Sequence, residues 1–454
     1  MSTTNSTTTR YVGLDVHKRL IHACIVDGKG KVLGSLQFHA TPESISVFAK
    51  KCLTHAVLVV LKATSNGWAV ADAFRPYVKE VVVSNPLATR AITKSKVKSD
   101  KVNARVLAHL LRWGYLPTVW QPDAQTQKLR QLTRRRAALV RQRTQLRNRI
   151  HSLLAMSFVE TPPDLFSRKG VAWLREFLKK GCLKDEAVFM IESDLRLLQS
   201  LQEEIDRFED LLARQAYADQ KVRLLMTLPG FDVTVALGFL AAVGDINRFQ
   251  SPHEVASYLG LVPSTRQSAD KCYHGPITKQ GNGQGRWLVI QAAQQMGRNP
   301  GPLGHFFRRL KRRKNHNIAV VATARKLAMI ATLMLKNNEP YRYAIPRSTE
   351  TKLARLRVRA TGRKRKGGGR KGTKCTAKIP GGSRTIKSLD EIYAREGLPA
   401  REKEPAPGEL AMLKRTGTAK FAESLKSEKI VPRRSSKTKA SQQRTANSRE
   451  LPRL

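Results

Sequence analysis

The residues best suited to chemistry lie between Gln267 and Gln291, in the segment QSADKCYHGPITKQGNGQGRWLVIQ. Ser268 offers a hydroxyl that can attack phosphorus once a base or a metal ion activates it. The glycines that follow allow backbone amides to approach a phosphate, and the start of a helix adds positive potential. Lys279 and Arg286 could neutralise the charge that develops during phosphoryl transfer. The segment predicts a phosphate-handling site, although an ordinary polar surface loop has a similar composition.

Two aspartates form a second candidate site. Asp15 lies in an apolar segment that predicts a strand, where aspartate is depleted, although an edge position or a cap would also explain it. Asp100 follows Ser99, a predicted N-cap, and Asn103 projects from the same face of the predicted helix. The alternative for Asp100 is an aspartate that only complements the helix dipole.

The elements that hold these residues follow from hydrophobic patterning. Residues 11–38 predict three strands, and 56–62 (AVLVVLK) predict a buried parallel strand. Residues 68–77 then predict a helix and 80–84 another strand. This alternation predicts an α/β domain at residues 10–120 with a mainly parallel core sheet.

Residues 121–217 predict two long amphipathic helices. The first, over 121–160, is rich in Arg and Gln, and the second, over 186–217, is more acidic. We expect an antiparallel coiled-coil hairpin with the basic helix against the acidic one. Two ordinary helices of a bundle would show the same pattern.

Residues 218–345 predict a mainly α-helical domain. Its segment Leu-Pro-Gly-Phe, with Gly230, resembles the turn of helix-hairpin-helix modules, in which backbone amides face a nucleic-acid phosphate. Pro-Gly between helices is also ordinary punctuation. A basic run is a further candidate for phosphate contact, with a solvated loop as the alternative. Its arginines are Arg308, Arg309, Arg312 and Arg313.

The chain has 454 residues and a formal net charge of +48, which predicts DNA or RNA as a partner. Residues 346–454 are basic and poor in large apolar residues, and so predict a mostly disordered tail, with a short helix open only at Leu410–Val431, that adds salt-sensitive affinity for nucleic acid. No signal peptide or membrane-spanning run is expected, and none of the five cysteines forms a Cys-x-x-Cys pair. We therefore expect a cytoplasmic protein, associated with the bacterial nucleoid.

Four segments occur in a characteristic order: GLDVHK, LKATSNGW, SDKVNARVLA, and LPGF followed by QSADK and ITKQGNGQGR. Over residues 10–345 they resemble the transposases of insertion sequence family one hundred and ten, which include the pilin-gene invertases. The resemblance implies a RuvC-like domain of the ribonuclease-H fold with an Asp-Glu-Asp-Asp site for Mg²⁺. A coiled coil and a C-terminal transposase domain with a nucleophilic serine follow. It also implies a guide-type bridge RNA, DNA ends and target as partners, and a homo-oligomer (dimer or tetramer).

The resemblance assigns roles to individual residues. Asp15 matches the first family aspartate and Asp100 the third acidic position, as catalytic residues and metal ligands. Ser268 matches the nucleophile, with Ala269 where the family has glycine. The downstream loop is matched by Lys279, Gly281, Asn282 and Arg286.

Two positions depart from the family pattern. Lys62 stands where the family has glutamate, and Asn103 where it has the fourth aspartate. Because Mg²⁺ takes hard oxygen ligands, both changes predict weakened metal binding, and Lys62 could pair with Asp15 or Asp100 in the place of a metal ion. If the site is nevertheless active, a nearby acid such as Asp72 or Glu80 would take the role of the glutamate.

Three hypotheses follow. The first is an active recombinase that forms a serine–DNA intermediate, and the intact serine segment favours it. The second is a catalytically decayed relative that only binds DNA or RNA, which Lys62 and Asn103 favour. The third, a structural nucleoid-type protein, accounts for the charge but not for the order of the motifs.

Overall fold

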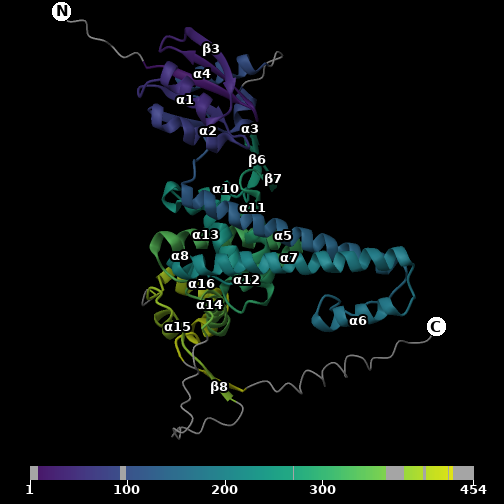
Figure 1. The fold of residues 1–454 in the computed structure, drawn as a ribbon. Coiled ribbons are helices and arrows are strands. Elements are labelled where there is room, and N and C mark those ends of the chain that lie inside the picture. The colour runs from purple at the N-terminus through teal and green to yellow at the C-terminus, as the bar shows by residue number, and fades with distance from the viewer. Residues whose placement is uncertain are drawn as a thin grey trace, which may run out of the picture. The chain divides into compact units, whose positions relative to one another are not determined.

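The computed structural model describes residues 9–92, 99–268, 270–363, 383–401, 405–427 and 429–432. It divides into two compact units, Met1–Asp123 and Ala124–Leu454 (Figure 1). Much of the predicted basic tail, at 364–382 and 433–454, lies outside the described residues, as does Ala269.

The first unit is built on a five-stranded sheet of order β3-β2-β1-β4-β5. Its strands are β1 (Tyr11–Val16), β2 (Leu20–Val26), β3 (Val32–His39), β4 (Leu58–Lys62) and β5 (Glu80–Ser84). β1, β2 and β3 pair antiparallel, whereas β4 and β5 run parallel to β1. The strands match the predicted segments, but the sheet is mixed and not mainly parallel, because the first three strands form a meander.

Helices cover both faces of this sheet. They are α1 (Pro42–Cys52), α2 (Gly67–Phe74), the short 3-10 helix η1 (Arg75–Tyr77), α3 (Pro86–Ile92) and α4 (Asp100–Arg112). Alternate β1 residues Val12 and Leu14 share an apolar core with Phe48 of α1 and Phe74 of α2. Gly13 faces the other side, toward α4. The α/β architecture predicted for this region is therefore present.

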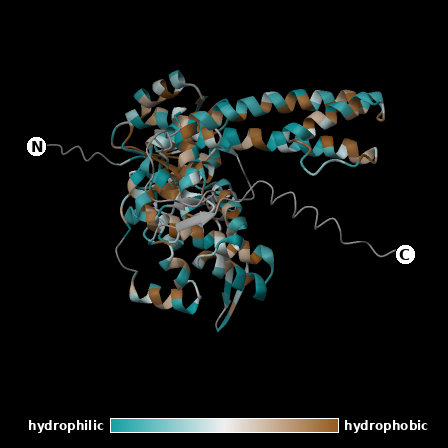
Figure 2. Ribbon diagram, turned by 90° about the horizontal axis from the view of Figure 1, so that it is seen from below, coloured by the Kyte–Doolittle hydropathy of each residue, from teal (hydrophilic) through white to brown (hydrophobic). Residues whose placement is uncertain are grey.

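The second unit begins with two long helices, α5 (Ala124–Met156) and α7 (Asp185–Ala218), with α6 (Arg168–Lys179) between them in sequence. The long helices lie side by side (Figure 1), and hydrophobic and hydrophilic residues alternate along both (Figure 2). Their polar contacts run in opposite sequence order: Arg136 with Glu209, Arg143 with Gln202, and Arg149 with Asp194. The pair is therefore antiparallel, with the basic helix against the acidic one, as predicted.

A mainly helical region packs against this pair. It contains α8 (Gln220–Leu225), α9 (Val233–Val243), η2 (Ile246–Arg248), α10 (Pro252–Tyr258), β6 (Pro263–Ser268), β7 (Lys271–Ile277), α11 (Gly283–Gln294), η3 (Gln295–Arg298), α12 (Pro302–Arg313) and α13 (His316–Asn337). α13 is long and apolar enough to cross a membrane. No membrane-spanning run was expected from the sequence. Its buried residues Ala324, Leu327 and Ala331 belong to the core of the unit, so α13 is the central helix of that core.

The prediction that residues 346–454 form a disordered tail is wrong for the part that the structure describes. This part contains α14 (Pro346–Thr361), β8 (Ser383–Ile386), α15 (Leu389–Arg395), α16 (Pro407–Arg415), α17 (Ala419–Glu423) and β9 (Lys429–Pro432). Leu353, Ile392 and Tyr393 are almost fully buried in the core of the second unit. The basic composition of the segment hid these apolar positions, which lie at spaced intervals between charged residues.

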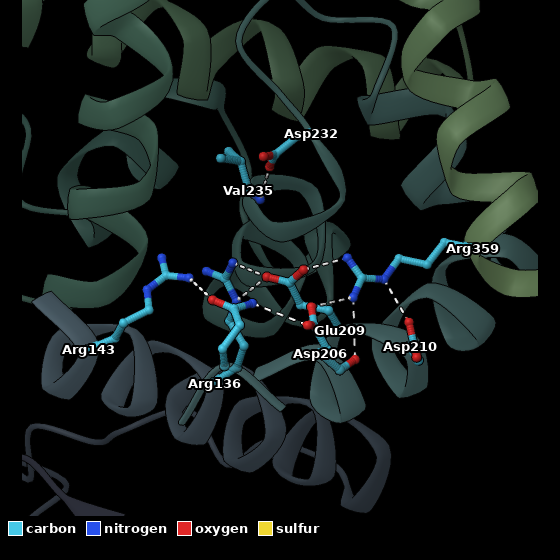
Figure 3. A network of polar contacts seen from close by, with 9 residues as sticks. Arg136, Arg143, Asp206, Glu209, Asp210, Asp232, Val235 and Arg359 are labelled. Carbon is cyan, nitrogen blue, oxygen red and sulfur yellow. Dashed lines mark hydrogen bonds and ion pairs between the residues drawn. The ribbon is translucent and has the colours of Figure 1, made fainter. Parts of the chain in front are cut away.

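Charge also ties this segment to the long acidic helix. The Arg359 guanidinium of α14 bonds to Asp206, Glu209 and Asp210 of α7 (Figure 3). Glu209 also accepts from Arg136 of α5, so a single carboxylate bridges two helices. Arg359 is one of the basic residues on which the prediction of a free tail rested, and it forms ion pairs within the protein.

Two truncations separate folding from nucleic-acid binding. Ending the chain after Ile345 removes Leu353 and Tyr393, and burial of each such side chain is worth roughly 1.5–3 kcal/mol, so we expect a large loss of stability. Ending it after Pro432 keeps the described elements and removes basic residues. The chain that ends after Pro432 should bind DNA with a weaker salt dependence than the full chain. The slope of log affinity against log salt concentration should become shallower by about 0.9 for each phosphate that is no longer neutralised. Urea unfolding and DNA binding at several salt concentrations measure both. Equal stability of the two truncated proteins would contradict the role given to α14 and α15.

Candidate active site

Asp15, His17 and Asp100 form a compact cluster in the first unit. One ligand atom from each lies within 4.8 Å of the others. His17 Nε2 is 3.2 Å from Asp100 Oδ1 and 3.7 Å from Asp15 Oδ2. Asp15 is buried, whereas the other two side chains are more than half exposed. The two aspartates therefore meet, as their positions in a strand and at a helix start predicted.

Gly13 allows α4 to pack closely against β1. A Cβ atom on Gly13 would lie 2.0 Å from the carbonyl oxygen of Ala104 and 2.6 Å from the amide nitrogen of Ala108. Only glycine at this point of β1 permits α4 to pack so closely. Because Asp15 follows two residues later on the same face, its carboxylate lies beside the first turn of α4, which carries Asp100.

Local hydrogen bonds hold the rest of the cluster. Ser99 caps α4, accepting from the Val102 amide at 3.3 Å, and so fixes where the helix begins. Asn66 donates from Nδ2 to the main-chain oxygen of His17 at 3.1 Å. His17 was not predicted as a site residue. His17 follows the end of β1 at Val16, so no periodicity within that strand indicated it, and only the approach of α4 brings Asp100 to its imidazole.

Asn103 and Lys62 lie next to the cluster. Asn103 donates from Nδ2 to Asp15 Oδ2 at 3.0 Å. Leu14 pairs with Leu61 in parallel register, so Lys62 is the neighbour of Asp15 on β4 and projects from the same face. Among the residues that the structure describes, no ion pair within 4.0 Å joins Lys62 to either aspartate. Lys62 is thus a neighbour of Asp15 by strand register without the ion pair that it could have formed there.

Ser268 is the last residue of β6 and pairs with Lys271 of β7, next to the tip of a two-stranded hairpin. It is exposed. The base of the hairpin, where Pro263 pairs with Ile277, leads directly to the loop that holds Lys279. Five residues of strand span about 17 Å. The structure therefore places the serine hydroxyl away from the predicted basic loop and not inside it.

The predicted loop residues instead build the start of α11. Asn282 caps the helix, accepting from the Gly285 amide at 2.9 Å. Arg286 donates from Nη1 to the main-chain oxygen of Leu259 at 3.0 Å, which secures the preceding turn. Lys279 is exposed beside them. The amides at the start of the helix and the Lys279 ammonium can attract an anion at this end of α11.

The turn at Gly230 is held from two sides. Gly230 has a φ of +81°, and a Cβ there would lie 2.5 Å from the main-chain oxygen of Ala292. Lys352 of α14 donates from Nζ to the main-chain oxygens of Leu228 and Phe231 at 3.0 and 2.9 Å. Lys352 and the turn line a cavity of about 500 Å³. α14 lies in the segment that was predicted to be a tail, and its Lys352 thus helps to hold the turn at Gly230 in place.

Burial lowers the pKa of Lys352 to about 8, partly offset by nearby Asp232. Between pH 8 and 10.5 the unfolded chain binds more protons at this lysine than the folded one, so this group makes stability rise with pH. We expect urea unfolding at pH 8 and pH 10 to show a larger rise for the wild type than for Lys352→Met, by roughly 1–3 kcal/mol. The exposed Lys311→Met variant should match the wild type. A rise of the same size in all three proteins would contradict the assignment.

The basic run, a candidate for phosphate contact with a solvated loop as the alternative, is the second half of α12. Arg308 donates from Nη1 to the main-chain oxygens of Gly297 and Asn299, at 3.1 and 2.7 Å, and so helps to hold the end of η3. Arg309 lies over the ring of Phe306. The remaining two predicted contacts, Arg312 and Arg313, are exposed. These last two are therefore the ones most available to a phosphate.

Comparison with known proteins matches both halves of the chain. Residues 12–159 match the IS110 DEDD family model described as "Transposase", and residues 222–305 match "Transposase IS116/IS110/IS902 family". The chain is 26% identical over 354 residues to the transposase for insertion sequence element IS1111A of Coxiella burnetii, covering 73% of this chain and 91% of that protein. It is 24% identical over 345 residues to the pilin gene-inverting protein of Moraxella bovis, covering 73% and 97%. It is also 27% identical over 289 residues to a putative transposase, y4qE, of Sinorhizobium fredii, covering 62% and 70%.

Proposed function

The chain belongs to the IS110 family of transposases, and on that premise we propose that it cuts and rejoins the DNA of an insertion sequence through a covalent intermediate on Ser268. The observation that carries the proposal is the meeting of Asp15 and Asp100 on one sheet face, next to His17. The order β3-β2-β1-β4-β5, with an aspartate on the central strand, supports a RuvC-like ribonuclease-H fold for this domain.

The proposed reaction is a transesterification. The Ser268 oxygen attacks a backbone phosphorus, an O–P bond forms, and the bond from phosphorus to a deoxyribose oxygen breaks. The serine proton passes to a base, and the departing oxygen takes up a proton to become a hydroxyl. Because one phosphodiester replaces another, a second deoxyribose hydroxyl can reverse the step and join new ends. The exposure of Ser268 at a hairpin end leaves its oxygen accessible to DNA.

The basic residues would hold DNA on either side of the reacting phosphate. The start of α11, with Lys279 and Asn282, can accept another phosphate of the same DNA, several nucleotides away from the reacting one, since it lies about 17 Å along the hairpin from Ser268. The turn at Gly230 and the exposed side chains of Arg312 and Arg313 supply further contacts.

The residues present do not fit the four-carboxylate Mg²⁺ site that the family implies. Asp15 and Asp100 supply two carboxylates, but Lys62 and Asn103 supply neither of the others. We therefore infer that recombination by this chain is weak. These two residues also favour the second candidate function, a catalytically decayed relative that still binds DNA or RNA.

The family relationship supports two partners besides the DNA ends and target. One is a guide-type bridge RNA, which the net charge of +48 would help to bind. The other is a second copy of the chain, in which the carboxylates of one protomer serve the serine of its partner. Exposed apolar residues on α7, among them Phe189, Met190 and Leu197, are consistent with such an assembly, and light scattering with and without nucleic acid measures its mass.

A supercoiled plasmid with the element ends, incubated with protein and RNA, tests the function. We expect a small amount of covalent protein–DNA adduct with the wild type and none with Ser268→Ala. Ser264→Ala, on the same hairpin, should behave like the wild type. Abundant Mg²⁺-dependent recombination by the unaltered chain would reject the inferred impairment. DNA binding with no adduct, in the wild type and after restoration of the acidic residues, would establish the decayed relative.

A further inference from the structure

The cluster of Asp15, His17 and Asp100 contains an imidazole beside two carboxylates, a donor set different from the four carboxylates of the family. We propose that this site binds one divalent transition-metal ion, of the class of Mn²⁺, Co²⁺ and Zn²⁺, in preference to Mg²⁺. Asp15, His17 and Asp100 are its protein ligands. The inference rests on the proposed function, because it specifies the metal ion of that same site.

Geometry permits a single ion to be shared. Protein ligands lie about 2.0–2.2 Å from such an ion, so two ligands on opposite sides of it are separated by no more than about 4.4 Å. The three ligand atoms already lie within 4.8 Å of one another. The exposed side chains of His17 and Asp100 need only small rotations to close this distance, and buried Asp15 supplies the fixed point.

Donor chemistry selects the metal. Mg²⁺ demands near-ideal octahedral oxygen coordination and keeps several water molecules, whereas imidazole nitrogen suits Zn²⁺, Fe²⁺ and their neighbours. Mn²⁺ accepts carboxylates and imidazole together. Three protein ligands also leave positions open for water or a phosphate oxygen, as catalytic metal sites require.

The neighbouring residues restrict the site to one ion. Asn103 directs its amide nitrogen toward Asp15 Oδ2, and a nitrogen donor of this kind does not bind a cation. Lys62 stands beside Asp15 on the adjacent strand and adds a positive charge where a second ion would need a carboxylate. The two departures from the family pattern thus oppose a second metal ion while leaving the three ligands in place.

Supporting hydrogen bonds orient two of the ligands. Asn66 fixes the main chain of His17, and Asn103 fixes one oxygen of Asp15, at 3.1 and 3.0 Å. Residues that orient metal ligands typically affect metal affinity by 10- to 100-fold, as an order of magnitude. The two hydrogen bonds limit the movement of these ligands before a metal ion binds.

The test is metal binding by the full-length chain, freed of metal and without nucleic acid. Mn²⁺ is followed by electron paramagnetic resonance, Co²⁺ by its visible absorption, and Mg²⁺ by competition with Mn²⁺. We expect one Mn²⁺ per chain, bound at least ~10-fold more tightly than Mg²⁺, and Co²⁺ more tightly than Mn²⁺ in line with the general order of affinities. His17→Gln should weaken Mn²⁺ binding at least ~10-fold, as ligand or ligand-orienting changes do, and change Mg²⁺ binding little.

Control variants carry the same substitutions elsewhere. His55→Gln changes an exposed histidine before β4, and Asp164→Asn an exposed aspartate before α6, and both should bind Mn²⁺ like the wild type. His17→Gln should keep the far-ultraviolet circular dichroism of the wild type, because the imidazole is 55% exposed. Asp100→Asn provides a second variant that should lose Mn²⁺.

Two results overturn the inference: no saturable Mn²⁺ binding, or equal affinity for Mn²⁺ and Mg²⁺ that His17→Gln leaves unchanged. Either result leaves the proposed function intact if the plasmid assay still gives a Ser268 adduct. Conversely, tight Mn²⁺ binding with no adduct under any condition refutes the proposed function and leaves the metal site standing.

Discussion

Replacing Lys62 by Glu and Asn103 by Asp in one chain is expected to create Mg²⁺ binding and to raise recombination by orders of magnitude. The first change alters the local charge by two units, and two unit charges 4 Å apart interact by roughly 4 kcal/mol at an effective dielectric constant of about 20. We expect Mg²⁺ affinity to rise at least ~100-fold, about 2.8 kcal/mol. Isothermal calorimetry measures the affinity, and the plasmid assay the recombination.

The same double variant has a second expected property. Asn103 now donates to Asp15 at 3.0 Å, and an aspartate there places two carboxylates together. Without metal they repel, so the melting temperature in chelator should fall below that of the wild type, and saturating Mg²⁺ should raise it by mass action. Ser268→Ala added to this variant should abolish strand exchange while leaving Mg²⁺ binding unchanged.

Lys79→Glu is the control for the charge change. Lys79 is exposed and precedes β5, at the opposite end of the sheet from Lys62. It should leave Mg²⁺ affinity and recombination at wild-type values. If Lys79→Glu raised Mg²⁺ binding as much as the double variant, the effect would reflect overall charge and not the site.

Gly13→Ala is expected to disrupt the site without touching any of its ligands. The new Cβ would meet the backbone of Ala104 at 2.0 Å and of Ala108 at 2.6 Å, and backbone atoms in a helix yield only by moving the helix. We expect a loss of about 1–3 kcal/mol in unfolding free energy. Because α4 carries Asp100, Mn²⁺ binding should fall as well. Denaturant unfolding and Mn²⁺ titration measure the two effects.

Gly34→Ala is the matched control in the same sheet. Gly34 lies in β3, and a Cβ there meets no atom within 4 Å. Where the backbone permits it, this substitution stabilises by about 0.4–1 kcal/mol through the unfolded state. Gly34→Ala should therefore be neutral or stabilising and should keep full Mn²⁺ binding. Equal behaviour of the two alanine variants would show that α4 does not depend on the small residue at position 13.

The first unit could be predicted largely from sequence, because its strands are short apolar runs between clear turns. The positions of Asp15 and Asp100, one in a strand and one after the cap Ser99, also predicted that they would meet. His17 was missed because its role depends on a distance between elements and not on a spacing within one. Gly13 was missed for the same reason, since only the packed helix reveals why a side chain is excluded.

The second unit was predicted less well. Charge complementarity between the long helices could be predicted from the sequence, and contacts such as that of Arg149 with Asp194 confirm the pairing. The folded part of residues 346–432 was not, because its apolar residues are few and separated by basic ones. The site of Ser268 was predicted as part of a glycine-rich loop, whereas strand pairing with Lys271 carries it to the far end of a hairpin. Pairing between strands is a long-range property that local composition does not contain.

The burial of Leu389, Tyr393 and Leu425 against the same core as Leu212 has a consequence for synthesis. Domains fold as units as the chain leaves the ribosome, N-terminal ones first, so the unit that ends at Asp123 can be complete while the rest is still being made. The second unit must wait for Arg359 and for the core residues from Leu389 to Leu425. Until then α7 presents Asp206, Glu209 and Asp210 without Arg359, and an arrested or frame-shifted chain never completes this core. A nascent chain of this kind therefore lacks a finished second unit until residues as far as Leu425 have been synthesised.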